Sequence, residues 1–168
     1  MSNFRASAFV ALGSNLGDSR SILMRAMAQL ETLSGAPLVK SSLWQTAPID
    51  CPPGSPPFVN AVVAITPRRG ETPESLLEQL QDLERKFGRQ RKGVQNEPRP
   101  LDLDLIFFGD ELRGTATLIL PHPRAHQRAF VLRPLSEIAP SLVLPGQDLT
   151  VRQLLERLPE DPTMRRLL

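Results

Sequence analysis

The strongest constraint on the fold is a short segment, Leu101 to Phe108, in which two aspartates alternate with leucines. Successive side chains of a strand point to opposite faces, so Asp102 and Asp104 share one face. The opposite face is expected to enter the core with the apolar residues Leu101, Leu103, Leu105 and Phe107. The segment therefore predicts a half-buried strand that carries two carboxylates about 7 Å apart, measured between Cα atoms.

Two carboxylates at this spacing can bracket one or two divalent cations. Mg²⁺ uses few protein ligands and usually shares phosphate oxygens. Without a cation or an arginine between them, two such acids would repel each other. A solvated pair on an exposed strand face has the same pattern, although carboxylates are depleted in strands. The spacing by itself leaves both interpretations open.

A basic segment leads directly into this strand. Residues 84–99 carry six basic and two acidic side chains, a net charge of +4 in a chain whose total is +2. Residues 89–100 lack apolar periodicity, which predicts a mobile loop. Arginine forks suit phosphate oxygens, and a loop can close over a triphosphate after binding. A solvated charge run is the alternative, but attachment to the aspartate strand favours phosphate binding.

The rest of the chain alternates strands with amphipathic helices. The predicted elements are strands over 8–12, 38–46 and 58–65, helices over 19–33 and from Thr72 to Phe87, a short return strand after the turn at 109–111, a short helix after His122, a strand near 142–144, and a last helix that opens with the capping box Thr150-x-x-Gln153. This order predicts an α+β sandwich of the ferredoxin-like kind, with a mostly antiparallel sheet covered by helices, in a single domain over residues 1–168.

Composition excludes several classes of protein. Twenty basic and eighteen acidic residues nearly cancel, so no global field favours nucleic acid or membranes. The single cysteine, Cys51, allows no intrachain disulfide, which fits a reducing compartment. The first residues lack a secretory signal, and no apolar run approaches the roughly 18–20 residues of a membrane helix. We therefore expect a cytoplasmic protein.

Several other residues are candidates for a binding site, each with a structural alternative. His122, between two prolines, is either structural or catalytic. Asn60 interrupts an apolar strand and needs hydrogen-bond partners if it is buried, so it either supports the fold or reads the edge of a heterocycle. Phe58 and Phe130 are either core residues or a platform for a flat ring. The turn at Gly13 is either an anion-binding loop or a tight connection.

Taken together, these segments resemble the 6-hydroxymethyl-7,8-dihydropterin pyrophosphokinase family. The matching segments are Ala11–Gly17, Arg99–Leu105, Pro121–Arg124 and Arg128–Leu135. The chain departs from some members at residues 95–98, which lack a Trp-Gly pair, and at Phe58 and Pro123, where tyrosines occur.

The resemblance implies transfer of pyrophosphate from ATP to 6-hydroxymethyl-7,8-dihydropterin, with release of AMP, in folate synthesis. It also implies a ferredoxin-like, monomeric enzyme with no nucleic-acid or membrane partner. The implied catalytic residues are Arg89, Arg99, Asp102 and Asp104, and the two aspartates would bind two Mg²⁺ ions together with ATP. The implied ATP contacts are Glu84, Arg89, Arg99, Ile106, His122 and Arg128. The implied pterin contacts are Thr46, Ala47, Pro48, Ile49, Phe58, Asn60 and Phe130.

Two other functions fit parts of this pattern. A nucleotidyltransferase also pairs a Gly-Ser turn with an Asp-x-Asp strand, but it attacks the α-phosphorus and releases pyrophosphate rather than AMP. A ferredoxin-like RNA-binding module would use residues 84–99 as its contact and would bind with strong salt dependence. The second reading gives Asp102 and Asp104 no role and lacks a pair of stacking aromatics on adjacent strands.

Overall fold

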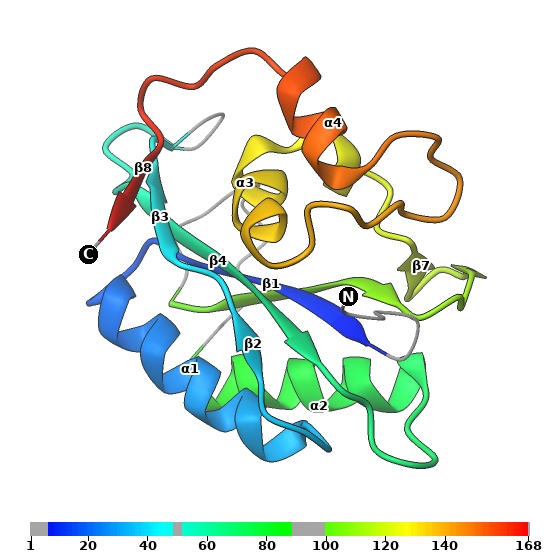
Figure 1. Ribbon diagram of the computed structural model, residues 1–168. Coiled ribbons are helices and arrows are strands. Elements are labelled where there is room, and N and C mark those ends of the chain that lie inside the picture. Colours follow the sequence, from blue (N-terminus) through cyan, green and yellow to red (C-terminus); the bar gives the residue numbers. More distant parts are fainter. Residues whose placement is uncertain (1–6, 49–51, 89–99, 168) are drawn as a thin grey trace.

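The computed structural model describes residues 7–48, 52–88 and 100–167. Its main feature is a six-stranded sheet with helices on both faces (Figure 1). The elements are β1 (Ala8–Ser14), α1 (Ser19–Leu33), β2 (Val39–Lys40), β3 (Leu43–Thr46), β4 (Phe58–Ile65), α2 (Pro73–Lys86), β5 (Asp102–Phe108), β6 (Arg113–Gly114), β7 (Ile119–Leu120), a 3₁₀ turn (Ala125–Gln127), α3 (Ala129–Ile138), α4 (Val151–Arg157) and β8 (Arg165–Leu167).

The strand order confirms the predicted fold. The sheet runs β5-β1-β4-β3-β8, β2 adds to β4, and every pairing is antiparallel. Within it, β1, α1, β3, β4, α2 and β5 follow one another as a β-α-β-β-α-β unit. This is the ferredoxin-like arrangement, and it brings the first and last strands of the unit, β1 and β5, side by side.

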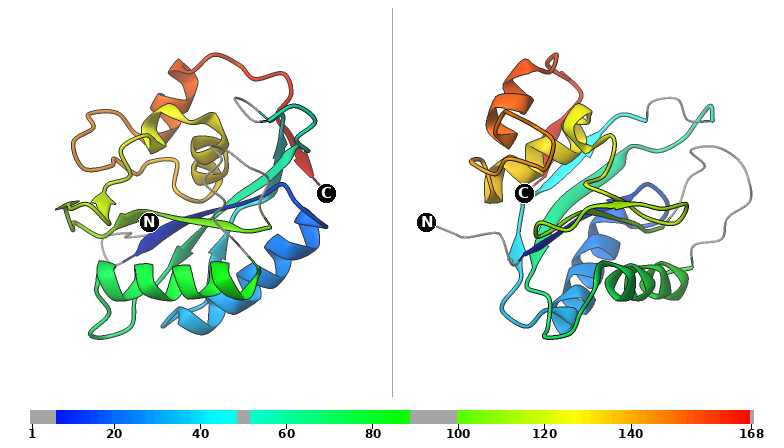
Figure 2. Two further views of the ribbon diagram at one scale, coloured as in Figure 1. Left: turned by 180° about the vertical axis from the view of Figure 1, so that it is seen from behind. Right: turned by 90° about the vertical axis from the view of Figure 1, so that its right-hand side faces the viewer.

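Helices α1 and α2 cover one face of the sheet (Figure 2). Each begins at a side-chain cap: Asp18 accepts from the N–H of Ser21, and Thr72 forms a capping box with Ser75. Their apolar stripes bury the leucines of β5 in one core cluster. The fully buried members from the two helices are Leu23, Ala26, Leu30, Leu76 and Leu80.

Helices α3 and α4 cover the other face, but only in part. Leu132 and Leu135 from α3 pack with Val151 from α4 in a second cluster against Phe9 and Val62. This cluster contains no residue of β5 before Ile106. The α3 face of the sheet is therefore apolar at one end and polar at the end where β5 begins.

A β-bulge in β5 corrects the predicted alternation. Val10 pairs with Leu105 and Phe9 pairs with Phe107, so Ile106 is an extra residue on β5. As a result Ile106 and Phe107 both join the α3 cluster, where Phe107 lies 5.6 Å from Phe9 between ring centroids. Leu101, Leu103 and Leu105 face α1 and α2 as predicted, whereas the placement of Phe107 with them was wrong.

Three other predicted elements need correction. The strand over 38–46 is divided into β2 and β3 at Ser41 and Ser42, because the Ser42 N–H donates to the Glu137 carboxylate and not to a strand. The return strand, β6, pairs with β7 and not with β5. Residues 142–144 form no strand: Leu144 is buried, but the Leu142 carbonyl accepts from the N–H of Val151. The sequence also gave no indication of β8.

Helices capable of crossing a lipid bilayer are absent from the described ranges 7–48, 52–88 and 100–167.

Candidate active site

The two aspartates of β5 lie on the polar end of the α3 face. Asp102 and Asp104 are half-buried, and the residues between and beside them point into the opposite core. The buried Glu84, at the end of α2, accepts a 2.9 Å hydrogen bond from the backbone N–H of Leu103. Glu84 therefore fixes the backbone midway between the two aspartates.

Gly13 lies between the aspartate strand and Asn60. In the register of the sheet, Gly13 pairs with Asp102 on one side and with Asn60 on the other. Paired residues of antiparallel strands project from the same face, and neighbouring strands lie about 4.8 Å apart. Asp102 and Asn60 are thus about 10 Å apart across the floor that Gly13 forms. A Cβ at Gly13 would lie 3.3 Å from Oδ1 of Asn60. Because glycine has no side chain, the space above Gly13 and beside Asn60 stays open.

Asn60 is held by a buried hydrogen bond on this floor. Its Nδ2 donates to the hydroxyl of Thr46 over 3.0 Å, and only 5% of Asn60 is exposed. Phe58, two residues earlier on the same face of β4, is half-buried. The structure therefore brings three of the residues predicted to contact the pterin, Thr46, Phe58 and Asn60, into one group.

His122 closes the other side of the face, next to β5. Its backbone N–H donates to the carbonyl of Ile106, and its Nδ1 accepts from the N–H of Arg124 over 3.1 Å. Burial lowers the pKa of His122 below 6.5, the positive charges of Arg128 and Arg124 lower this pKa further, and Asp102 acts in the opposite direction. The imidazole is consequently neutral at pH 7, with its proton on Nε2, because Nδ1 is already an acceptor.

The position of His122 gives a testable pH dependence. An NMR titration of the ligand-free chain should give His122 a pKa below 6.5, and Arg128→Gln should raise it, because one of the charges that lower it is removed. Between the folded pKa and about 6.5 the unfolded chain binds more protons, so this group makes the folded state more stable as pH rises through that window. Arg133→Gln on α3 is the control. A His122 pKa that Arg128→Gln leaves unchanged would contradict the assignment.

Arg128 and Phe130 mark the start of α3 beside this group. The guanidinium carbon of Arg128 lies 5.4 Å from the centre of the Phe130 ring, and Phe130 is 37% exposed. Arg128 therefore occupies one face of the Phe130 ring.

The remaining predicted contacts differ in what the structure says of them. Ile49, Arg89 and Arg99 lie outside the described residues. Ile106 as a whole residue is only 1% exposed, and its carbonyl accepts from the N–H of His122. The N–H of Ala47 donates to the hydroxyl of Thr163, and Pro48 has no N–H to offer.

Glu137 on α3 also organises this region, and sequence reasoning missed it. Its carboxylate accepts from the N–H and the hydroxyl of Ser42 and, over 2.7 Å, from Nε1 of Trp44. Arg133 lies over the Trp44 ring, 5.6 Å from its centre. These contacts tie β3 to α3. A glutamate on an amphipathic helix gives no local signal of such a role, since its partners lie more than 90 residues away.

The chain is thus a ferredoxin-like α+β protein that carries two carboxylates, a histidine and a buried amide on one face of its sheet. The family model described as "7,8-dihydro-6-hydroxymethylpterin-pyrophosphokinase (HPPK)" matches residues 9–140. The chain belongs to this family.

Individual relatives agree with the family match. The chain is 41% identical over 150 residues to the 2-amino-4-hydroxy-6-hydroxymethyldihydropteridine pyrophosphokinase of Synechocystis sp., covering 89% of this chain and 75% of that protein. It is 34% identical over 151 residues to the folic acid synthesis protein fol1 of Pneumocystis carinii, covering 89% of this chain but only 20% of the longer relative.

Solved structures agree on the fold. The crystal structure of wild-type Plasmodium falciparum HPPK-DHPS with pteroate superimposes with a TM-score of 0.70 at 13% identity, over 90% of this chain and 44% of that one. At this identity the likeness concerns the fold alone.

Proposed function

We propose that this chain transfers a pyrophosphoryl group from ATP to 6-hydroxymethyl-7,8-dihydropterin and releases AMP. The observation that carries the proposal is the row Asp102, Gly13 and Asn60 across one face of the sheet. It sets one of the two carboxylates suited to metal-bound phosphate, that of Asp102, on a residue about 10 Å from Asn60, whose buried amide is suited to a heterocycle edge. The hydroxymethyl oxygen of the pterin would attack the β-phosphorus of ATP between them.

Mg²⁺ fits the donor set of this face. Carboxylate oxygens are its preferred protein ligands, and it commonly uses one or two of them together with substrate phosphates. Among the residues that the structure describes, no three acidic, histidine or cysteine side chains gather into a complete metal site, so phosphate and water would supply the other ligands. Asp102 and Asp104 would hold two ions. The bound metal would offset the charge that develops on the phosphate oxygens.

The protein's own groups then position the two substrates. Neutral His122 presents an Nε2–H that can donate to a phosphate oxygen, and Arg128 adds a positive charge beside it. Arg89 and Arg99 are proposed from the sequence to contact the triphosphate as well. Asn60 and Thr46 would bind the polar edge of the pterin while Phe58 and Phe130 pack against its ring. Phosphoryl-type transfer depends chiefly on such positioning and electrostatic stabilisation, and no strong general base is required.

Product analysis tests the reaction directly. The purified chain is incubated with Mg²⁺ and ATP, with and without 6-hydroxymethyl-7,8-dihydropterin, and the nucleotides are separated and quantified. Pterin-dependent AMP supports the proposal. Release of inorganic pyrophosphate with an adenylated product would indicate nucleotidyl transfer, and pterin-independent products would contradict both.

Gly13→Ala should weaken pterin binding about 3- to 10-fold, the equivalent of roughly one hydrogen bond. The new Cβ would approach Oδ1 of Asn60 to 3.3 Å and move it by a few tenths of an ångström. Alanine reduces the entropy of the unfolded chain, whereas the shift of Asn60 strains its buried bond to Thr46, so the free energy of unfolding should change by less than the pterin affinity. Pterin fluorescence titration and urea unfolding measure the two effects. Gly35→Ala, far along the chain from this face, is the control; equal pterin affinity in both variants would contradict the role of Gly13.

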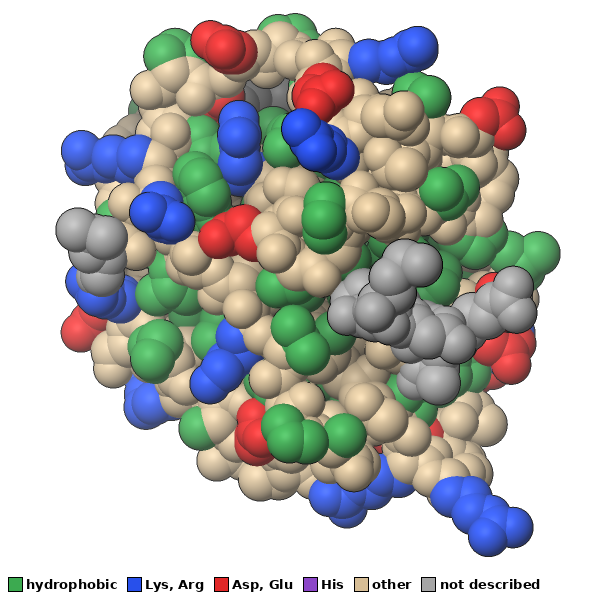
Figure 3. Space-filling model, viewed as in Figure 1, with side chains coloured by type: hydrophobic (Ala, Val, Ile, Leu, Met, Phe, Trp, Pro, Cys, Tyr) green, Lys and Arg blue, Asp and Glu red, His purple; other side chains and the backbone are tan. Residues whose placement is uncertain are grey.

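We further propose a single domain that acts as a monomer in the cytoplasm. We also propose that it has no nucleic-acid partner, because acidic and basic side chains are interspersed on the face shown in Figure 3, in contrast to the single-sign surface typical of nucleic-acid binding. Light scattering of the purified chain tests the oligomeric state.

A further inference from the structure

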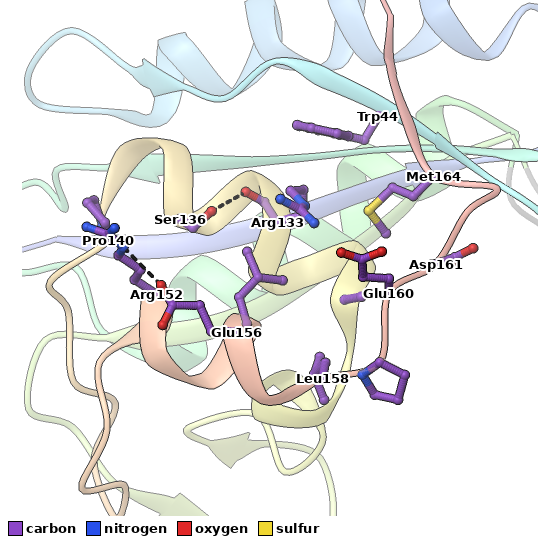
Figure 4. A pocket seen from close by; sticks show the side chains of 13 residues that line it. Trp44, Arg133, Ser136, Pro140, Arg152, Glu156, Leu158, Glu160, Asp161 and Met164 are labelled. Carbon is purple, nitrogen blue, oxygen red and sulfur yellow. Dashed lines mark hydrogen bonds and ion pairs between the residues drawn. The ribbon is translucent and has the colours of Figure 1, made fainter.

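The C-terminal segment lines a cavity on its way from α4 to the sheet. Residues 158–164 connect α4 to β8 along a cavity of about 820 Å³, which lies between Trp44 of β3, helices α3 and α4, and the segment itself (Figure 4). Asp161 and Met164 belong to its wall. Because the cavity separates this stretch from the core, contacts at its far end must fix its position.

Those contacts lie along the outer edge of β3. In β8, Leu167 pairs with Leu43 and Arg165 pairs with Gln45, so β8 extends the sheet beside β3. Immediately beyond the last residue of β3, the N–H of Ala47 donates to Oγ1 of Thr163 over 3.3 Å. The segment is thus joined to β3 by the backbone pairing of β8 and, at the residue after β3, by the side chain of Thr163.

Asp161 orients the hydroxyl of Thr163 for this contact. The Thr163 hydroxyl donates to Oδ1 of Asp161 over 2.6 Å, and the Thr163 N–H donates to the same oxygen over 2.9 Å. A hydroxyl has one hydrogen and two lone pairs, so once its hydrogen is directed to the carboxylate it faces Ala47 as an acceptor. The hydrogen bond to a carboxylate favours this orientation, at a place where Thr163 is exposed and Asp161 is half-buried.

This relay, the hydrogen bonds from Thr163 to Asp161 and from Ala47 to Thr163, limits the hydrogen-bonding groups that the backbone after β3 presents to a ligand. The Ala47 N–H is occupied by Thr163, and Pro48 has no N–H, so residues 47 and 48 can present carbonyl acceptors only. Thr46, directly before them, is joined to Asn60 on the floor of the site. A ligand held here must therefore present hydrogen-bond donors, such as ring N–H or amino groups, to this part of the pocket.

We propose that Asp161 and Thr163 are positioning residues for the substrate pocket: they hold the peptide between Thr46 and Ala47 by its N–H, so that residues 46–48 offer carbonyl oxygens to the donor groups of an aminated heterocycle. Both residues lie beyond the part of the chain that the family model matches, residues 9–140. The inference rests on the proposed function, since it assumes that the pterin lies against residues 46–48.

Thr163→Val tests the relay, because valine has nearly the same shape but cannot accept a hydrogen bond. Thr163→Ser keeps the hydroxyl and should therefore retain the hydrogen bond to Ala47 and the pterin affinity. Thr32→Val is the matched control, since the Thr32 hydroxyl donates only to a carbonyl in its own helix, that of Gln29, on the exposed surface of α1. The readouts are the hydrogen-exchange rate of the Ala47 amide by NMR, the Kd of 6-hydroxymethyl-7,8-dihydropterin by fluorescence, and the Kd of ATP.

Thr163→Val should accelerate exchange at Ala47 and raise the pterin Kd about 3- to 10-fold, with the Kd of ATP unchanged. Thr163→Ser and Thr32→Val should behave as the parent chain. Faster exchange at Ala47 with an unchanged pterin Kd, or equal losses of pterin and ATP binding, would overturn the positioning role. If the parent chain itself fails to bind the pterin, the proposed function is overturned as well. If the parent chain binds the pterin and only the results for the variants differ from those expected, the positioning role alone is overturned.

Discussion

Replacing either aspartate of β5 by asparagine should lower kcat by about 10³-fold or more while the fold stays intact. A metal ion that offsets developing phosphate charge contributes several kcal/mol to the transition state, and about 1.4 kcal/mol corresponds to a factor of ten in rate. Asparagine keeps the shape of Asp102 or Asp104 but removes the charge that binds the cation. Because both side chains lie on the half-buried polar end of the face, the hydrophobic core is not disturbed.

The measurement is steady-state release of AMP at saturating pterin, with Mg²⁺ varied. A nearby acid provides the control: Asp110, exposed in the turn that follows β5, is changed to asparagine in the same way. Asp110→Asn should retain the activity of the parent chain, and circular dichroism should show the same thermal midpoint for all variants within a few degrees. Normal turnover in Asp102→Asn and Asp104→Asn would end the assignment of metal to this strand.

Asn60→Ala should reduce kcat/KM for the pterin by about 10- to 100-fold and leave the Kd of ATP unchanged. This range corresponds to losing a hydrogen bond of roughly 1.5–3 kcal/mol from a buried, pre-organised group. The same change leaves the hydroxyl of Thr46 without its Asn60 partner in a buried place, so a modest loss of stability is expected too. A loss of kcat/KM for the pterin with an unchanged Kd of ATP indicates that Asn60 recognises the pterin. A similar loss for both substrates indicates general destabilisation of the protein.

Gln45→Ala is the matched control for Asn60. Gln45 loses the same kind of amide from the adjacent strand, but it pairs with Val59 and so projects from the opposite face of the sheet. Gln45→Ala should leave the pterin kinetics unchanged. Equal losses in the two variants would show that the amide of Asn60 supports only the fold.

Local sequence signals predicted most of the fold. The helix over 19–33, the strand over 58–65, the helix start at Thr72 and the capping box at Thr150 all appear where expected. These features depend on residues within four or five positions of one another. The errors concern pairings between distant segments: β8 joins β3 across more than a hundred residues, and Leu144 is buried although residues 142–144 form no strand.

The site follows the same division. The shared face of Asp102 and Asp104 could be read from alternation, and the structure places them together. The contribution of Gly13 could not, because it depends on the register with two other strands. Glu137 and Thr163 were missed for a related reason: each acts on β3 through contacts with residues more than 90 positions away.

The bulge at Ile106 divides β5 into two halves whose side-chain phases are independent. Before it, odd-numbered residues anchor the strand to α1 and α2; after it, an even-numbered residue, Phe108, does so. An insertion or deletion after Ile106 would therefore change the face to which Phe107 and Phe108 point, whereas the two carboxylates before the bulge would stay on the same face. A change of length after Ile106 would thus disturb the packing of Phe107 and Phe108 and leave Asp102 and Asp104 on their shared face.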